Sequence, residues 1–445
     1  MSQSTATAAA NVNAWKGVGC LLPFLGAAIA DTFMGKYYTI LASSIIYILG
    51  LGMLSISAGL PSLSKESSGR PQILQKVVFF VGLYLVDVAR SGHKPCIQAF
   101  GADQFDGAHL QESKAKSSFF NWWSFGIAIG ALLGLGLLSY VQDNLSWGLG
   151  FGVSCIIMVI SFVLFLLGTM TYRYTLKVEG ENPFKSIGRV FVRAAKNWNS
   201  SAPPVLVICD EEEAQEPQPR QLKFFDKALI APDGEGNGKA CSESEFEEAK
   251  VVLRLFPIWA VTLIFAMVYA QHGTLFTIQG VTFDRKIGSS FTLPAASLQC
   301  VMDITILILV PIYNYMIVPL TRKLTGKPAG ISILQRVGIG FFITIITMVV
   351  SAVIENKRLK TASRHGLIDS PDATVSMSIW WLIPQHVLFG MTTIFTMTSL
   401  QEFFYDQVPN ELGSVGLALY ASIHGLGDFL SSFLVSFISK ANQKK

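Results

Sequence analysis

Three ionisable side chains share one face of the strongly apolar segment at 77–100. Asp87, Arg90 and Lys94 follow one another at three- and four-residue steps, so a helix presents them on one side, and Gln98 continues the stripe. A charge at bilayer depth is costly unless it faces protein or a water-filled cavity. The stripe therefore predicts an aqueous path between helices. The alternative is a structural Asp87–Arg90 pair, with Lys94 extending to the membrane interface.

A second polar face is predicted in the segment at 412–438, where Tyr420, His424 and Asp428 are spaced at four-residue intervals. A neighbouring histidine and aspartate inside a membrane form a candidate proton relay. The same pair can equally be a hydrogen-bonded packing contact between helices, and the sequence leaves both interpretations open. Further polar residues in apolar segments are Gln299, Asp303 and Asn314.

The sequence contains no pattern typical of an enzyme or of a bound cofactor. The H-E-x-x-H, Walker and G-x-S-x-G motifs are all missing. None of the six cysteines forms a C-x-x-C pair, which argues against a zinc site. The net charge of +4 is too small to indicate a nucleic-acid partner. We therefore expect a protein that is not an enzyme and that holds no cofactor and no metal.

The composition indicates that lipid replaces water over much of the protein surface. The chain of 445 residues is 51% hydrophobic and 14% charged, whereas a soluble domain carries about 25% charged residues. A membrane-spanning helix needs roughly 20 apolar residues, and ten segments of the chain meet this requirement. They predict an all-α, multi-pass integral membrane protein in a lipid bilayer. The ten segments are 14–34, 37–59, 77–100, 117–140, 147–171, 251–271, 294–318, 332–354, 376–399 and 412–438.

A long polar stretch divides these spans into five and five. We predict an N-terminal helical bundle at 1–171, a linker at 172–250 and a C-terminal helical bundle at 251–445. Within the linker, apolar residues at helical spacing between 184 and 198 predict an amphipathic helix. It lies either on the membrane surface or in solvent as an ordinary linker helix. Basic residues near the spans favour a cytoplasmic linker by a small margin.

Four local motifs carry a resemblance to a known family. They are D-x-x-x-G-K at 31–36, GADQFD at 101–106, FFNWW at 119–123 and QEFFYDQVP at 401–409. Together they resemble the plant nitrate transporter 1/peptide transporter family, which is the proton-dependent oligopeptide transporter family of the major facilitator superfamily. The resemblance implies a major facilitator fold with two helical bundles. Matched to the twelve family spans, the chain contains spans 2 to 11, which is ten of the usual twelve transmembrane helices.

The resemblance also implies roles for individual residues. Lys94 matches a span 4 lysine that pairs with an acidic residue on span 10, but Thr393 stands at that acidic position here. Tyr269 replaces a histidine of a nitrate carrier, and Gln299 matches a position that lines the central cavity. With Asp87 and Arg90, these residues are the candidates for substrate binding and proton coupling. Candidates for gating at the cytoplasmic face are Asp31, Lys36, Asp103, Asp106, Glu402 and Asp406.

The function implied by the resemblance is proton-coupled secondary transport. A symporter of small peptides, nitrate or related small organic anions would work by alternating access, in the plasma membrane or the vacuolar membrane. The E-x-x-E-R motif of span 1 is missing and Thr393 replaces an acid, so weak or absent proton-driven transport is expected. The alternative is a truncated, non-transporting family member that acts only by association with itself or with full-length relatives.

Overall fold

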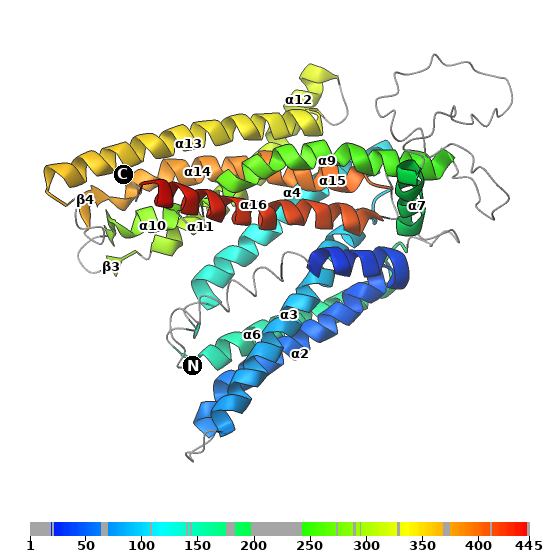
Figure 1. Ribbon diagram of the computed structural model, residues 1–445, viewed down its shortest axis with the longest axis horizontal. Coiled ribbons are helices and arrows are strands. Elements are labelled where there is room, and N and C mark those ends of the chain that lie inside the picture. Colours follow the sequence, from blue (N-terminus) through cyan, green and yellow to red (C-terminus); the bar gives the residue numbers. More distant parts are fainter. Residues whose placement is uncertain are drawn as a thin grey trace.

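The fold is built almost entirely of helices arranged as two bundles (Figure 1). The computed structural model describes residues 19, 22–63, 70–106, 109–138, 141–142, 145–174, 183–196, 243–272, 275–287, 291–293, 295–326, 330–367, 374–409 and 412–442. The first residues of the expected span at 14–34, and the linker from 197 to 242 with its acidic run at 210–213, lie outside the described residues.

The N-terminal bundle begins with an apolar helix, Leu22–Met34, whose last turn is the π-helical η1 (Ala30–Met34). Gly35 then takes a positive φ of 79°, a conformation that glycine adopts without steric cost, and redirects the chain into the next helix. The remaining elements are α2 (Lys36–Leu63), α3 (Arg70–Ala102), α4 (Leu110–Leu133), η2 (Gly134–Leu138), α6 (Trp147–Leu167) and η3 (Gly168–Met170).

The C-terminal bundle contains more interrupted helices than the N-terminal bundle. Its elements are α9 (Glu243–Ala270), α10 (Leu275–Val281), η5 (Ala295–Leu298), α11 (Gln299–Ile312), η6 (Tyr313–Ile317), α12 (Val318–Thr325), α13 (Ile333–Arg364), η7 (Ile379–Leu382), α14 (Ile383–Thr392), η8 (Thr393–Thr398), α15 (Ser399–Asp406) and α16 (Gly413–Asn442). Both η6 and η8 are π-helical turns inside longer helices, a feature that is frequent at functional sites.

The membrane-protein prediction is confirmed, with corrections to several boundaries. Within the described residues, six helices are long and apolar enough to cross a membrane. The expected span at 294–318 is helical, with η5 as its first turn, and continues to Thr325. The expectation that 376–399 is helical throughout is wrong, because this segment begins as a strand. That strand, β4 (Val375–Ser378), alternates buried and exposed residues and pairs in parallel with β1 (Phe283–Asp284). A second small sheet joins β2 (Lys286–Ile287) to β3 (Phe291–Thr292).

The expected linker is partly helical. Helix α7 (Pro183–Lys196) lies where the amphipathic pattern predicts a helix, and α9 begins eight residues before the expected span. Val190 of α7 is fully buried, as are Phe246 and Ala249 near the start of α9, which α7 contacts. One apolar face of α7 therefore packs against protein. We call the end of the molecule that carries α7 and the start of α9 the linker end (Figure 1).

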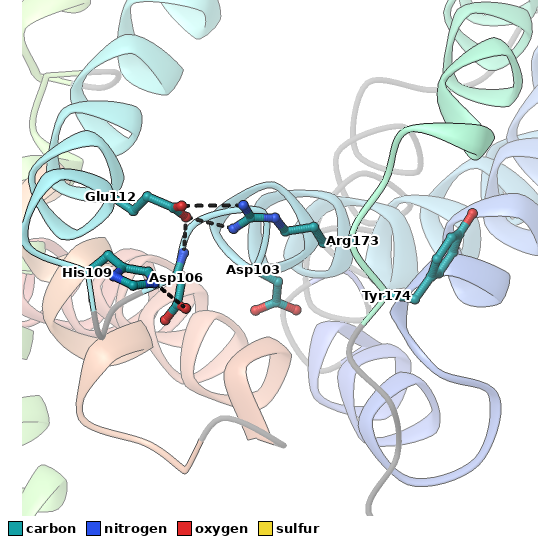
Figure 2. Close-up of a pocket in the computed structure, with 6 residues that line it drawn as sticks. All are labelled: Asp103, Asp106, His109, Glu112, Arg173 and Tyr174. Carbon is teal, nitrogen blue, oxygen red and sulfur yellow. Dashed lines mark hydrogen bonds and ion pairs between the residues drawn. The ribbon is translucent and has the colours of Figure 1, made fainter.

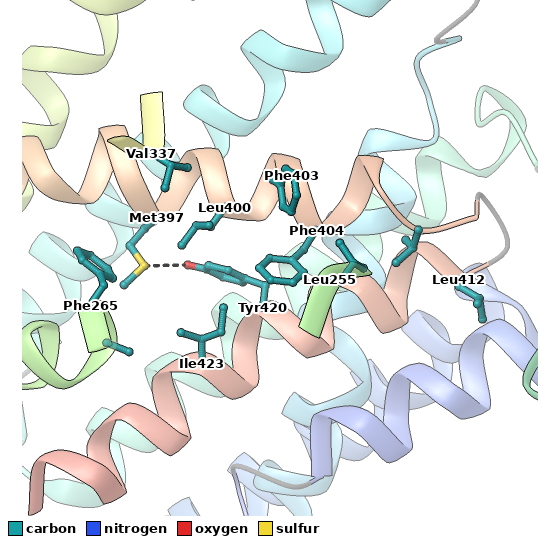
Figure 3. Close-up of a cluster of buried hydrophobic side chains, with 12 residues drawn as sticks. Leu255, Phe265, Val337, Met397, Leu400, Phe403, Phe404, Leu412, Tyr420 and Ile423 are labelled. Atoms are coloured by element: carbon teal, nitrogen blue, oxygen red, sulfur yellow. Dashed lines mark hydrogen bonds between the residues drawn. The ribbon is translucent and has the colours of Figure 1, made fainter. Parts of the chain in front are cut away.

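The two bundles meet at the linker end and diverge toward the opposite end (Figure 1). Helices α2, α3 and α6 form the core of the N-terminal bundle, with a close approach between the backbones of Gly50 and Gly82. Helix α4 packs along α11 and so joins the N-terminal bundle to the C-terminal one. A cluster of buried side chains from α9, α13, α15 and α16 fills the C-terminal bundle (Figure 3).

Candidate functional site

The charged stripe of α3 is divided by the fold. Arg90 and Lys94 are exposed, whereas Asp87 and Gln98 are buried at 5% and 4% exposure. Within the described residues, Asp87 and Arg90 make no ion pair shorter than 4 Å, although the charge of Arg90 acts on Asp87. Gln98 reaches the other bundle, where its Nε2 donates to Gln401 Oε1 at 2.9 Å. The stripe thus combines accessible charges with one contact between the bundles.

The accessible end of Lys94 lies near the polar face of α16. The charge of Lys94 acts on the His424 ring, whose Nε2 lies 3.1 Å from the Tyr420 hydroxyl. The His424 ring also meets the Tyr269 ring edge-on, with the centroids 5.4 Å apart. A cation of one bundle and a histidine of the other thus lie near one another. The proposed relay through His424 and Asp428 stays a prediction.

Thr393, which the sequence predicts to stand at the acidic position of span 10, places a hydroxyl there. Thr393 opens η8 and donates to the carbonyl of Phe389 at 2.9 Å. Its side chain is within hydrogen-bonding range of Tyr269, whose ring packs 5.2 Å from that of Phe389. Gln299 lies on α11, where its Nε2 donates to Thr277 at 3.4 Å. Tyr269 and Thr393 therefore meet, and Gln299 lies against α10.

Buried apolar side chains support the polar face of α16. The Tyr420 hydroxyl donates to Met397 Sδ at 3.7 Å, which ties α16 to η8 (Figure 3). Leu400 and Ile423 pack around this contact and are fully buried. Since Tyr420 and His424 lie one turn apart, this packing also fixes the position of the histidine.

The six expected gating residues lie at or near the linker end. Lys36 Nζ pairs with Asp103 Oδ2 at 2.6 Å, and the Tyr405 hydroxyl donates to the same carboxylate across the two bundles. Asp31 accepts from the backbone N–H of Val415 at 2.9 Å, which holds the start of α16 against η1. The D-x-x-x-G-K motif thus joins two helices of its own bundle to two helices of the other.

The remaining gating contacts involve α4. Lys116 pairs with Asp406 at 2.7 Å, and its ammonium also lies 4.6 Å from the centre of the Tyr405 ring. Further along α4, the hydroxyls of Ser124 and Thr398 lie 2.8 Å apart. Each of these contacts crosses from the N-terminal bundle to the C-terminal bundle. They extend the closed region from the linker end toward the centre of α4.

A buried arginine was missed at the sequence level. Arg336 of α13 donates to Glu402 at 2.9 Å and to Asn121 Oδ1 of α4 at 2.9 Å. Asn121 donates in turn to Asn314 of η6 at 3.1 Å, and the guanidinium lies 4.9 Å from the centre of the Tyr313 ring. The available signal was Arg336 as the only charged residue of the apolar segment 332–354, which indicates a functional position in a membrane protein.

Asp106 lines a pocket at the linker end (Figure 2). Its backbone N–H donates to Glu112, which also pairs with Arg173 at 2.7 Å. The hydrogen bond to Glu112 raises the pKa of the Arg173 guanidinium above its usual value. Asp103 also lines this pocket and lies nine residues after Lys94 on α3, about 13.5 Å along the helix. The pocket is therefore separate from the central residues.

The described residues contain no group of three or more His, Cys, Asp or Glu side chains that could hold a metal ion. The groups that the described residues bring together are charged side chains, hydroxyls and imidazoles. These groups can bind an anion at Lys94, hold protons at buried carboxylates and form a closure that opens when its ion pairs break.

Comparisons with known proteins agree with this arrangement. The model of the POT family matches residues 37–445. Protein NRT1/PTR FAMILY 5.10 of Arabidopsis thaliana is 53% identical over 455 residues, which cover 100% of this chain and 80% of that protein. Protein NRT1/PTR FAMILY 5.12 of the same plant is 48% identical, with coverage of 100% and 79%.

Solved structures show the same fold at low sequence identity. The crystal structure of an auto-inhibited POT family peptide transporter has a TM-score of 0.58 and 21% identity, and the match covers 96% of this chain and 81% of that one. A POT family transporter in complex with 5-aminolevulinic acid has a TM-score of 0.58 and 14% identity, with coverage of 95% and 80%.

Proposed function

The chain belongs to the POT family of transporters, and from this premise we propose that it carries small peptides, nitrate or related small organic anions together with protons. Transport would proceed by alternating access, in which the two bundles rock about a central site. The linker end would be the cytoplasmic end, in keeping with the basic residues near the spans. The conformation described above would then be closed to the cytoplasm and open to the other side.

The observation that carries this proposal is the uneven distribution of contacts between the bundles. Cross-bundle polar contacts at Asp103, Gln98, Lys116 and Asn121 lie at or near the linker end, where the bundles meet, while Lys94 is exposed. An accessible ion pair contributes about 0.2–1 kcal/mol and a neutral hydrogen bond about 0.5–1.5 kcal/mol. Each such contact is individually weak enough for a ligand that binds the two conformations with different affinity to offset it.

Lys94 is proposed to attract the anionic group of the substrate. Lys94 is an exposed residue near His424, and the acid that would neutralise its charge in the family pattern is replaced by Thr393. A nitrate ion or a peptide carboxylate can therefore pair with Lys94 without first displacing an internal carboxylate. Tyr269 and His424 supply hydrogen-bonding groups beside it.

Uptake of isotope-labelled nitrate and of labelled dialanine in oocytes tests the proposal. We expect uptake of at least one of them above the level of uninjected cells, and higher uptake in acidic than in neutral medium. Lys94→Ala should abolish this uptake at unchanged surface expression, while Lys360→Ala, at the exposed end of α13, should leave it intact. Equal uptake by the Lys94→Ala variant would contradict the proposed binding role.

One observation favours a second function without transport by this chain itself. Thr393 in place of an acid deprives Lys94 of its family partner, and this loss fits a chain that acts through association with full-length relatives. In that case the chain alone would show no uptake, but its co-expression would change the uptake by a full-length relative. Uptake by the chain alone would contradict this alternative.

A further inference from the structure

We propose that the carboxylate of Asp303 is the proton-binding group of this carrier, in place of the acid that is absent at Thr393. The inference rests on the proposed function, because it names the site of proton coupling within it. Asp303 lies on α11, five residues from the start of that helix, and its side chain is 5% exposed.

Asp303 is a buried residue whose carboxylate lacks a polar partner among the described residues. Within the described part of the chain, no hydrogen bond and no ion pair reaches its oxygens. An isolated buried carboxylate is strongly disfavoured as an anion, so such a group takes up a proton unless a cation approaches. Intramembrane carboxylates of this kind are functional positions by default, since a purely structural one would have a partner.

The packing of α14 places Asp303 beside the residue that replaces the family acid. A side chain at Gly390 would lie 2.9 Å from the carbonyl oxygen of Met302, so the two helices touch at this level. One turn later, Thr393 approaches the sulfur of Met302 at 3.9 Å. Asp303 follows Met302 directly, and its charge acts on Tyr269, the hydroxyl neighbour of Thr393.

The titratable groups around Asp303 are few and carry no positive charge nearby. Helix α9 contributes the phenol of Tyr269, and α11 itself contributes the thiol of Cys300. Helix α14 carries His386, two turns before Thr393. The Nδ1 atom of His386 lies 2.8 Å from the carbonyl oxygen of Leu382. The face of α4 that packs on α11 is apolar and includes Ala128. Whether Asp303 is protonated therefore depends on the access of water to its carboxyl group.

Asp303 exchanges its proton with water on each side of the membrane. On the open side, the Asp303 carboxylate accepts a proton from a hydronium ion, which leaves a neutral carboxylic acid and a water molecule. When the linker end opens, the protonated Asp303 side chain returns that proton to water and becomes a carboxylate again. Neutralisation removes the penalty of burying the charge, so the protonated form favours the states in which the bundles close over it.

Asp87 is the competing carboxylate, and the test must separate the two. It is also 5% exposed, and its Oδ2 has no hydrogen-bond partner among the described residues. However, the charge of Arg90 acts on Asp87, whereas no basic side chain among the described residues acts on Asp303. A nearby cation keeps a carboxylate ionised, so Asp303 is the better proton acceptor.

Infrared difference spectroscopy tests the protonation directly and needs no substrate. The full chain in lipid nanodiscs is compared between acidic and neutral buffer, and the protonated carboxyl C=O band is followed. We expect this band in the unsubstituted chain and, undiminished, in Asp284→Asn, an exposed control carboxylate outside the helices. In Asp303→Asn the band should be weaker, with the contribution of other buried carboxylates such as Asp31 remaining. An unchanged band in Asp303→Asn, or a loss in Asp87→Asn instead, would overturn the proposal.

Transport in proteoliposomes supplies the second arm. With labelled dialanine and nitrate as probes, Asp303→Asn should lose accumulation driven by a pH gradient but keep counterflow exchange of the probe between the two sides. Retained gradient-driven accumulation in Asp303→Asn would refute the role of Asp303. If the unsubstituted chain moves neither probe while the band behaves as expected, the proposed substrates fail and the proton site stands.

Discussion

The guanidinium of Arg336 lies 2.9 Å from the carboxylate of Glu402, and the two side chains are 3% and 6% exposed. The same guanidinium donates to Asn121 of the other bundle. The pair thus lies within the C-terminal bundle, and Arg336 connects it to the N-terminal bundle through the side-chain amide of Asn121. A buried pair of this kind is worth little in net stability when intact, but removal of one partner leaves an uncompensated charge.

We predict that Arg336→Leu destabilises the protein strongly. Loss of the arginine leaves Glu402 buried without its cation, which costs about 3–5 kcal/mol. The double variant Arg336→Leu with Glu402→Leu should recover much of this loss, because neither charge then remains. Denaturation of the purified protein in detergent measures both effects. Equal stability of the single and double variants would show that the pair does not couple.

Loss of one accessible pair at the linker end should shift the balance between conformations without unfolding the protein. Asp406→Asn removes the partner of Lys116, and a pair of this exposure contributes about 0.2–1 kcal/mol. The population open at the linker end should therefore rise severalfold at most. Spin labels at Ser113 of α4 and Lys323 of α12 would report it as a longer distance component. An unchanged distribution would contradict a closing role for the pair.

Two glycines of α13 provide a matched pair of substitutions. A Cβ at Gly340 would collide with Thr396 of η8, including its backbone nitrogen, whereas a Cβ at Gly338 would meet nothing within 4 Å. We expect Gly340→Ala to destabilise the protein by about 1–3 kcal/mol through overpacking. Gly338→Ala should be neutral or stabilising by up to about 1 kcal/mol, since alanine is the better helix former. Thermal unfolding of the two variants measures the difference.

The consequence of the missing acid can be tested by restoring it. Thr393→Glu introduces a carboxylate at the position that pairs with the span 4 lysine in the family pattern. We expect stronger dependence of uptake on the pH gradient, because two carboxylates would then be available for protons. Uptake at several pH values in the variant and the unsubstituted chain measures this. A pH response in Thr393→Glu equal to that of the unsubstituted chain would show that an acid paired with Lys94 adds nothing to proton coupling in this chain.

Periodicity and local motifs were sufficient to predict the class of fold. Runs of apolar residues predicted the helices, and the D-x-x-x-G-K and QEFFYDQVP motifs predicted the residues that meet at the linker end. The partners of those residues could not be predicted, because contacts such as Gln98 with Gln401 span 303 residues of sequence. A hydrophobicity pattern records burial and does not record which helices become neighbours.

The sequence patterns also could not predict where the helices are interrupted. The run at 376–399 is as apolar as a helix needs, yet Val375 and Met377 alternate with exposed residues in a strand that pairs with β1. Short apolar runs are ambiguous between strand and helix, and only the presence of Phe283 as a packing partner decides it. Similarly, nothing in the local sequence distinguishes the π-helical turns η6 and η8 from regular helix.

A reversible cross-link between α4 and η8 tests alternating access most directly. The hydroxyls of Ser124 and Thr398 lie 2.8 Å apart on opposite bundles, so two cysteines at these positions can form a disulfide in the closed state. The two substitutions, Ser124→Cys and Thr398→Cys, are made in a protein that lacks the six native cysteines. We predict that oxidation of this double variant stops uptake of the transported probe and that reduction restores it. The single-cysteine variants should be unaffected. Full uptake by the cross-linked protein would contradict the rocking of the two bundles.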